Sequence, residues 1–152
     1  LAQAGDYEAR QRMIVSNLAY GAQACYRGPR LYDCDEVRAM VTRWVDWYKR
    51  YRDVLESDVI HGSSRRADGR GLDWVLHANP RTDPRAMLVV FNPGAAAMRR
   101  GIPLDLYFAG LSGRVEMVDE NGLARELQLD ARACGVLEVE VPAGSQRWFA
   151  FR

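Results

Sequence analysis

The chain has 152 residues, of which 48% are hydrophobic and 27% are charged, and its formal net charge is +1. This composition is typical of an ordinary globular protein. A nearly neutral chain gives no electrostatic reason to expect nucleic acid or an anionic membrane as a partner. No apolar run approaches the roughly 20 residues that span a bilayer. We therefore expect neither a nucleic-acid partner nor a membrane partner.

The first residues, which begin at Leu1, have neither the basic start nor the long apolar core of a signal peptide. We expect the chain to be part of a longer polypeptide. These residues indicate no particular cellular compartment, and a secreted or periplasmic location of that longer polypeptide is compatible with the sequence.

A first helix is predicted over Glu8–Cys25, although Gly21 is unfavourable inside it. Its apolar positions recur at helical spacing: Met13, Ile14, Leu18, Ala22 and Cys25. The pair Gly28-Pro29 then interrupts the pattern, because proline cannot continue a helix. Asp33 or Asp35 is expected to cap the helix that follows, by accepting hydrogen bonds from its free N–H groups.

A second helix is predicted from about Asp35 to Glu56, and it gives the clearest local signal in the chain. Steps of three and four residues form one wide apolar stripe: Val37, Met40, Val41, Trp44, Tyr48, Tyr51 and Leu55. A stripe this rich in aromatic residues must lie against a substantial surface.

The rest of the chain reads as strands. Residues 63–71 form a loop rich in Gly, Ser and Arg. Apolar or alternating segments follow at 73–78, 86–91, 104–109, 114–117, 127–129, 137–141 and 148–151, and residues 119–122 form a hairpin turn. The uninterrupted run at 86–91 is typical of a strand buried on both faces.

Six or seven short strands without intervening helices predict a mainly β fold. We expect an antiparallel β-sandwich, with Greek-key-like connections, preceded by one or two α-helices. Residues 1–57 would form a helical lead-in, and residues 58–152 the sandwich.

The sequence has few residue patterns that are typical of a catalytic site, a metal site or a disulfide. Its histidines, His61 and His77, lack metal-ligand spacing, and we expect His77 to be structural. Cys25 and Cys34 could pair in an oxidising compartment, although free thiols are favoured. We expect no metal and no cofactor.

Several carboxylates lie close together in the sequence near the junction of the two zones: Asp53, Glu56, Asp58 and Asp73. Glycoside hydrolysis needs two carboxyl groups roughly 5–10 Å apart across a cleft. Acidic residues at a helix end or on a strand face are usually solvated, so we expect no catalytic residues in this chain.

Two aromatic clusters could contact a ligand or a partner. In the loop between the helices, Tyr26 could stack on a sugar ring while Arg27 and Arg30 bind hydroxyl or carboxylate groups. Packing of Tyr26 and Tyr32 with solvated arginines is favoured over this binding role. The second cluster, on the predicted second helix, consists of Trp44, Trp47, Tyr48 and Tyr51. Its helical spacing favours a packing face, with self-association or a carbohydrate platform as alternatives.

Three ordered phrases resemble the carboxy-terminal region of α-galactosidase-like glycoside hydrolases. The phrase Trp47–His61 resembles their last barrel helix and the link that follows it. Met87–Pro93 resembles the central strand of their terminal sandwich, and Pro103–Leu111 resembles the next strand. The segment Gly94–Arg100 departs from the polar turn expected there.

The resemblance implies that residues 1–57 are the end of a truncated (β/α)8 barrel and that carbohydrate is the substrate of the parent polypeptide. The catalytic aspartates of that family lie on earlier barrel strands, so no position here inherits them. If the loop follows the last barrel segment, Tyr26, Arg27 and Arg30 could face the substrate cleft.

Three functions follow as hypotheses. The first is a structural or accessory β-sandwich of a glycoside hydrolase that is not catalytic alone. The second is a non-catalytic carbohydrate-binding module that uses exposed aromatics such as Tyr107 and Trp148. The third is an interaction domain that dimerises through the aromatic helix.

Overall fold

The computed structural model describes residues 4–22, 32–60 and 67–152. The chain divides into two compact units, Leu1–Glu56 and Ser57–Arg152. No helix in the described part of the chain is long and apolar enough to cross a membrane.

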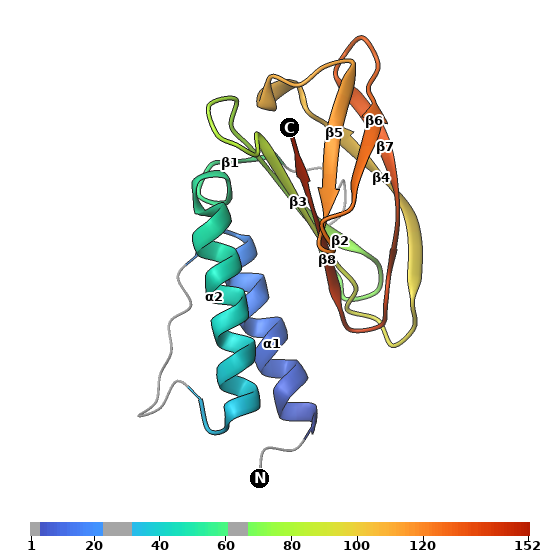
Figure 1. The fold of residues 1–152 in the computed structure, drawn as a ribbon. Helices are drawn as coiled ribbons and strands as arrows, with labels where there is room; N and C mark the ends of the chain where they lie inside the picture. Colours follow the sequence, from blue (N-terminus) through green and yellow to red (C-terminus); the bar gives the residue numbers. More distant parts are fainter. Residues whose placement is uncertain (1–3, 23–31, 61–66) are drawn as a thin grey trace. The chain divides into compact units, whose positions relative to one another are not determined.

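The first unit contains two helices, of which α1 covers Ala4–Ala19 (Figure 1). The prediction of a helix over Glu8–Cys25 was wrong at both ends. The helix ends early because Gly21 has a positive φ of 68°. The N–H of Gly21 donates to the carbonyl of Leu18, and the N–H of Ala22 donates to the carbonyl of Asn17. This pair of bonds is the Schellman arrangement, in which a left-handed glycine closes a helix.

Helix α2 covers Asp35–Leu55, within one residue of the predicted range. The predicted caps Asp33 and Asp35 were wrong, because Cys34 occupies the cap position and makes no side-chain capping bond. The Asp33 carboxylate instead lies 2.6 Å from a guanidinium nitrogen of Arg10. Most of the predicted stripe is buried: Val37, Met40, Val41, Trp44, Tyr51 and Leu55. Tyr48 is half-buried, and Trp47 and Val54, which lie outside the predicted stripe, are buried as well.

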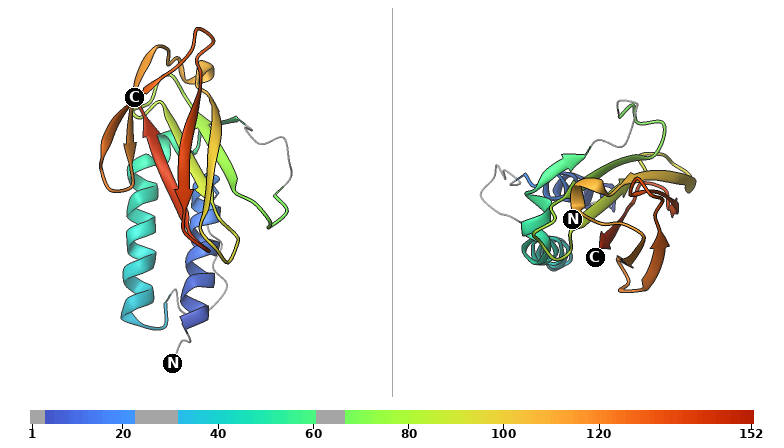
Figure 2. Two further views of the ribbon diagram at one scale, coloured as in Figure 1. Left: turned by 90° about the vertical axis from the view of Figure 1, so that its right-hand side faces the viewer. Right: turned by 90° about the horizontal axis from the view of Figure 1, so that it is seen from above.

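In the second unit, the described residues form eight antiparallel strands in two sheets (Figures 1 and 2). The strands are β1 Asp58–Ile60, β2 Asp73–Ala78, β3 Ala86–Phe91, β4 Met98–Asp105, β5 Arg114–Asp119, β6 Ala124–Gln128, β7 Cys134–Val141 and β8 Gln146–Phe151. Six of them form a sheet in the order β1-β2-β3-β8-β5-β6, and β4 pairs with β7. The predicted fold class, helices followed by an antiparallel β-sandwich, is confirmed.

The strands β2 and β3 have the predicted bounds, and the predicted 114–117/127–129 hairpin is present as β5 and β6. One strand was misplaced. Residues 104–109 were predicted as a strand, but β4 ends at Asp105 and Tyr107–Ala109 form a 3-10 helix, η1. The left-handed Gly110, with φ of 65°, ends this turn. Strand β4 pairs only with β7, and Pro103 is tolerated there because an edge strand has one side without a hydrogen-bonded neighbour.

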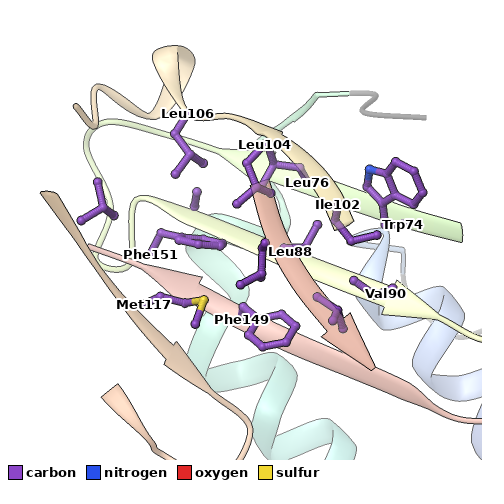
Figure 3. Packing of buried hydrophobic residues seen from close by; sticks show 14 of the residues in the cluster. Trp74, Leu76, Leu88, Val90, Ile102, Leu104, Leu106, Met117, Phe149 and Phe151 are labelled. Atoms are coloured by element: carbon purple, nitrogen blue, oxygen red, sulfur yellow. The ribbon is translucent and has the colours of Figure 1, made fainter. Parts of the chain in front are cut away.

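The core of the second unit is formed by alternate residues of both sheets. Figure 3 shows members of this cluster from β2, β3, β4, β5 and β8: Trp74, Leu76, Leu88, Val90, Ile102, Leu104, Met117, Phe149 and Phe151. Between them, Val75, Met87 and Val89 point to the opposite face of the larger sheet and are also buried. The prediction that the 86–91 strand is buried on both faces is confirmed.

Candidate functional site

The predicted binding loop with Tyr26, Arg27 and Arg30 lies outside the described residues. Its role in substrate binding stays a prediction. Cys25 also lies outside them, so its pairing with Cys34 stays a prediction. Cys34 forms no disulfide with a cysteine of the described residues.

The aromatic cluster of α2 is largely buried. Trp44 and Trp47 are both 8% exposed and Tyr51 is 7% exposed. The Trp44 and Trp47 rings meet edge to face at 5.5 Å, and Trp47 lies 6.2 Å from Tyr51. This geometry is typical of core packing. Self-association through this cluster stays a prediction.

Tyr48, in the same cluster, donates its hydroxyl proton to the carboxylate of Glu56. Burial and this neighbouring carboxylate raise the pKa of the Tyr48 hydroxyl. The contact therefore holds the phenol in its protonated form, in which it can donate.

His77 is fully buried in β2, and its Nδ1 lies 3.4 Å from the carbonyl oxygen of Ser57. A buried, hydrogen-bonded histidine on a central strand fits the structural role that we expected. His61 lies outside the described residues. Within the described ranges, no group of three or more His, Cys, Asp or Glu side chains could hold a metal ion.

The acidic residues of the second unit near the junction do not form a catalytic pair. Asp58 is opposite Ala78 at one end of β2, and Asp73 begins that strand at its other end. Five residue steps of a strand separate these positions by about 17 Å. Paired glycosidase carboxylates lie roughly 5–10 Å apart.

One cavity in the sandwich unit has a volume of about 490 Å³. This is the size of ordinary small-molecule sites, which span roughly 300–1,000 Å³. We call it the Trp74 cavity. Its lining comes from β1, β2, β4, β7 and the turn before β7: Ile60, Trp74, Leu76, Pro103, Leu104, Asp105, Asp130, Cys134, Gly135 and Val136.

Two carboxylates in this lining are fixed by backbone hydrogen bonds. Asp130 Oδ1 accepts from the N–H groups of Arg132 and Cys134, both at 2.8 Å. Asp105 Oδ1 accepts from the N–H of Tyr107 at 3.1 Å. The two Asp130 contacts lower the pKa of its carboxyl group. A general acid for glycoside hydrolysis needs a raised carboxyl pKa, so Asp130 is suited to accepting hydrogen bonds rather than to donating a proton.

The thiol of Cys134 lies among the same groups. Burial, and then the charges of Asp130 and Asp105, raise the pKa of this thiol, and Arg132 acts in the opposite direction. A raised pKa keeps the sulfur protonated and poorly nucleophilic. The cavity therefore shows no activated nucleophile at Cys134.

Trp74 contributes a buried hydrogen-bond donor. The residue is 5% exposed, and its indole N–H finds no acceptor in the described part of the chain. The Arg100 guanidinium lies 5.4 Å from the centre of the Trp74 ring. Figure 3 shows the indole at the edge of the labelled cluster. The Nε1 atom is closed off within the packed side chains, so this N–H is an unsatisfied donor of the core, which costs free energy, and it is not presented to the cavity.

Sequence reasoning missed this cavity. Trp74 was noted only as part of a strand segment, and Asp105, Asp130 and Cys134 lie far from it in the chain. The cavity exists because β4 and β7 pair and pack over β2, and that pairing has no local signal. An isolated Trp at the start of a buried strand was the only cue.

Comparison with known proteins gives information on the fold. No protein-family model and no curated protein matches the chain. Among solved structures, it is similar to a family 27 β-L-arabinopyranosidase from Geobacillus stearothermophilus, with a TM-score of 0.57 and 10% identity over 95% of the chain. A Bacteroides fragilis protein assigned as an α-galactosidase matches with a TM-score of 0.55 and 15% identity over 96% of the chain.

The chain has the fold of a part of α-galactosidase-like glycoside hydrolases. The same fold occurs in an α-amylase from Geobacillus thermoleovorans, which matches with a TM-score of 0.57 and 10% identity over 96% of the chain. The resemblance found in the sequence is therefore confirmed for the fold. The chain spans only 29%, 28% and 32% of the lengths of these three proteins, respectively.

Proposed function

We propose that this chain is the carboxy-terminal part of a glycoside hydrolase and that it acts as an accessory β-sandwich that is not catalytic alone. The observation that carries the proposal is the extent of the fold match. Nearly the whole chain, 95–96% of it, superposes on less than a third of each of three carbohydrate-active enzymes. The shared part includes the helices as well as the sandwich.

The helical unit fits the same proposal. A helix with a continuous buried stripe, such as α2, gains most of its stability from tertiary packing. In a parent enzyme, α1 and α2 would be the last helical elements of a (β/α)8 barrel, and the sandwich would follow from Ser57 onward. Carbohydrate would then be bound by the parent barrel, with Tyr26, Arg27 and Arg30 as candidate contacts at its rim.

The carboxylates described in the sandwich support an accessory role because several have structural partners. Asp119 is 5% exposed and accepts hydrogen bonds from the N–H groups of Asn121 and Leu123. Its other oxygen lies 3.6 Å from Arg147, and Arg147 also pairs with Glu120 at 2.5 Å. These contacts stabilise the turn between β5 and β6.

The test compares the longer polypeptide with and without residues 58–152. We expect the longer polypeptide to hydrolyse an aryl glycoside, and we expect removal of the sandwich to lower its thermal inactivation temperature. In the proposal the active site lies in the barrel, outside residues 58–152. The KM of the truncated enzyme that stays folded should therefore change little. A longer polypeptide that cleaves none of a panel of aryl glycosides would overturn the proposal.

A further inference from the structure

A second hollow in the sandwich unit is rich in arginine. It has a volume of about 460 Å³ and is formed by the turn between β2 and β3 and by the residue that follows β8. We call it the arginine pocket, and its lining consists of Pro80, Arg81, Thr82, Asp83, Arg85 and Arg152. Three of these six side chains carry a guanidinium group and one carries a carboxylate. The pocket is therefore positively charged, in a chain whose formal net charge is only +1.

Hydrogen bonds hold the turn that carries two of these arginines. The N–H of Asn79 donates to the carbonyl of Arg85 over 2.8 Å, and the N–H of Arg85 donates to the carbonyl of Phe151 over 2.9 Å. The Asn79 side chain accepts from the N–H of Arg81 over 3.0 Å, and its carbonyl accepts from the Thr82 hydroxyl over 3.1 Å. A site whose backbone is ordered before the ligand arrives loses less conformational entropy on binding.

The guanidinium group of Arg152 already has acidic partners. Its Nε lies 2.9 Å from Oδ1 of Asp83, and its Nη1 lies 3.8 Å from a carboxylate oxygen of Glu116. The backbone N–H of Arg152 also donates to the carbonyl of Glu116 over 2.9 Å, which fixes this residue beside β5. The charge of Arg152 is thus balanced, and Asp83 is the carboxylate that this pair places on the pocket wall.

Arg81 and Arg85 supply the charge that no described carboxylate balances. Neither guanidinium group forms an ion pair within the described part of the chain. Arg85 makes one long contact, 3.4 Å from Nη1 to the carbonyl of Gly110, and both residues are exposed. A guanidinium group presents five N–H donors in a planar fork that matches the oxygens of a phosphate or carboxylate group. The pocket therefore offers two positive charges and many free donors to an anion.

Charge and donor number favour a phosphate group over other anions. A phosphate monoester carries about −1.5 to −2 charges near pH 7 and has three strong acceptor oxygens. Two guanidinium groups match this charge, whereas a monocarboxylate would balance only one of them. The volume of about 460 Å³ lies in the range of small-molecule sites, so there is room for the organic part of an ester beside the phosphate.

We propose that the arginine pocket binds a small phosphate monoester, with the guanidinium groups of Arg81 and Arg85 bonding to the phosphate oxygens. The negative charge of Asp83 opposes this binding while it holds Arg152. The proposal concerns binding only. It goes beyond the accessory role proposed above and does not depend on it, because the whole lining belongs to the sandwich unit.

The experiment titrates the 152-residue chain with glycerol 3-phosphate and follows the backbone amides by NMR. The solution is kept at about pH 7.5, where the monoester is mostly a dianion, and at constant ionic strength. We expect saturable shifts at the amides of Arg81, Thr82 and Arg85, with a Kd of about 0.1–10 mM. Glycerol, which lacks the phosphate, should cause no shift there. Inorganic phosphate should bind more weakly than the ester, because it fills less of the pocket.

Four variants locate the site and test the sign of each charge. Arg81→Gln and Arg85→Gln should each weaken binding about three- to tenfold, through loss of one charge-assisted contact at an exposed site. Asp83→Asn removes the opposing charge and releases Arg152, so it should strengthen binding about two- to fivefold. Arg125→Gln is the matched control, an exposed arginine on β6 outside the lining. It makes the same change in net charge and should alter Kd by less than about twofold, because distant charges are screened.

Several results would overturn the proposal. One is the absence of saturable shifts at the pocket amides up to about 50 mM glycerol 3-phosphate, far above millimolar Kd values. Equal losses in Arg81→Gln and Arg125→Gln would show that only net charge attracts the anion. Weaker binding in Asp83→Asn would contradict the assigned charges, and equal affinity for inorganic phosphate would exclude an ester site. If Arg85→Gln fails to fold, the other variants decide the question. Hydrolysis by the longer polypeptide is a separate measurement, so failure here leaves the accessory role untouched.

Discussion

The side-chain amide of Asn92 donates a hydrogen bond to the carbonyl oxygen of Val141 over 2.9 Å. Asn92 follows β3 of the six-stranded sheet, and Val141 ends β7 of the two-stranded sheet. The same amide nitrogen lies 2.8 Å from the carbonyl of Ala96 and 3.0 Å from that of Pro142. Asn92 is 2% exposed, so this buried group links the two layers of the sandwich.

Replacing Asn92 should therefore destabilise the sandwich. Asn92→Ala leaves buried carbonyl groups without a donor, and each such group costs about 1–3 kcal/mol. We expect the free energy of unfolding to fall by about 2–4 kcal/mol, measured by urea denaturation of the chain. Asn121→Ala, in an exposed turn, should change it by less than about 0.5 kcal/mol. Equal effects of the two substitutions would contradict the linking role.

The contacts of the Asn92 side chain could not be predicted from the sequence. An apolar strand followed by Asn-Pro was recognised as part of a family resemblance, and the contact to Val141, 49 residues later, explains why an amide side chain is suited to this position. Local periodicity was sufficient for α2, β2 and β3, whose buried faces repeat at regular spacing. It failed where pairing with a distant strand decides the conformation.

Strand β4 is the clearest case in which local periodicity does not predict a strand. Residues 98–103 have no alternation, and they become a strand because they pair along β7 from Val141 to Val136. A Cβ at Gly101 would lie 2.8 Å from the Glu138 carboxylate and 2.9 Å from a Val136 methyl group, so these two side chains would have to shift to accept a larger residue. The Trp74 cavity depends on the same pairing, so it could not be predicted either.

Gly21 should be intolerant of substitution. A Cβ at this position would lie 2.4 Å from the carbonyl oxygen of Leu55, and the backbone is left-handed. We expect Gly21→Ala to destabilise the helical unit by about 2–4 kcal/mol through strain and overpacking. The loss should appear as a lower midpoint in thermal unfolding followed by circular dichroism at 222 nm, the helical band.

Gly122→Ala is the matched control for Gly21. Gly122 has φ of 76°, but no heavy atom lies within 4 Å of the Cβ position. Only the conformational cost of about 1–2 kcal/mol applies there. A Gly21 variant that is no less stable than the Gly122 variant would show that the approach to Leu55 is unimportant.

The buried carboxylate of Asp119 should act mainly as a hydrogen-bond acceptor. Its Oδ1 accepts from the N–H groups of Asn121 and Leu123 at 2.9 and 3.0 Å, whereas the contact of Oδ2 to Arg147 is longer, at 3.6 Å. Asp119→Ala should cost about 1–3 kcal/mol of unfolding free energy, and Asp119→Asn, which keeps an acceptor, less than about 1 kcal/mol. The denaturant midpoints of the two variants measure these losses. A loss of unfolding free energy in Asp119→Asn above about 1 kcal/mol would indicate that the ion pair with Arg147 is the more important contact.

The Cys134 thiol should react slowly with iodoacetamide at pH 8. Burial, Asp130 and Asp105 raise its pKa, so the thiolate fraction at this pH is smaller than for an ordinary cysteine. Asp130→Asn keeps an oxygen for the turn but removes the charge, which should lower the pKa and speed alkylation severalfold. Arg132→Gln should slow it. Site-resolved mass spectrometry separates Cys134 from Cys25 and Cys34, and unchanged rates in both variants would exclude electrostatic control.

The proposal that this chain is a non-catalytic part of a glycoside hydrolase is tested most directly by assaying two proteins in parallel. One is the 152-residue chain, and the other is the longer polypeptide that, in the proposal, also contains a (β/α)8 barrel. Both are given p-nitrophenyl α-D-galactoside and a panel of related aryl glycosides. The account predicts release of nitrophenol by the longer protein and none above the buffer rate by the chain alone. Hydrolysis by the isolated chain, or no hydrolysis by the longer protein on any glycoside, would contradict it.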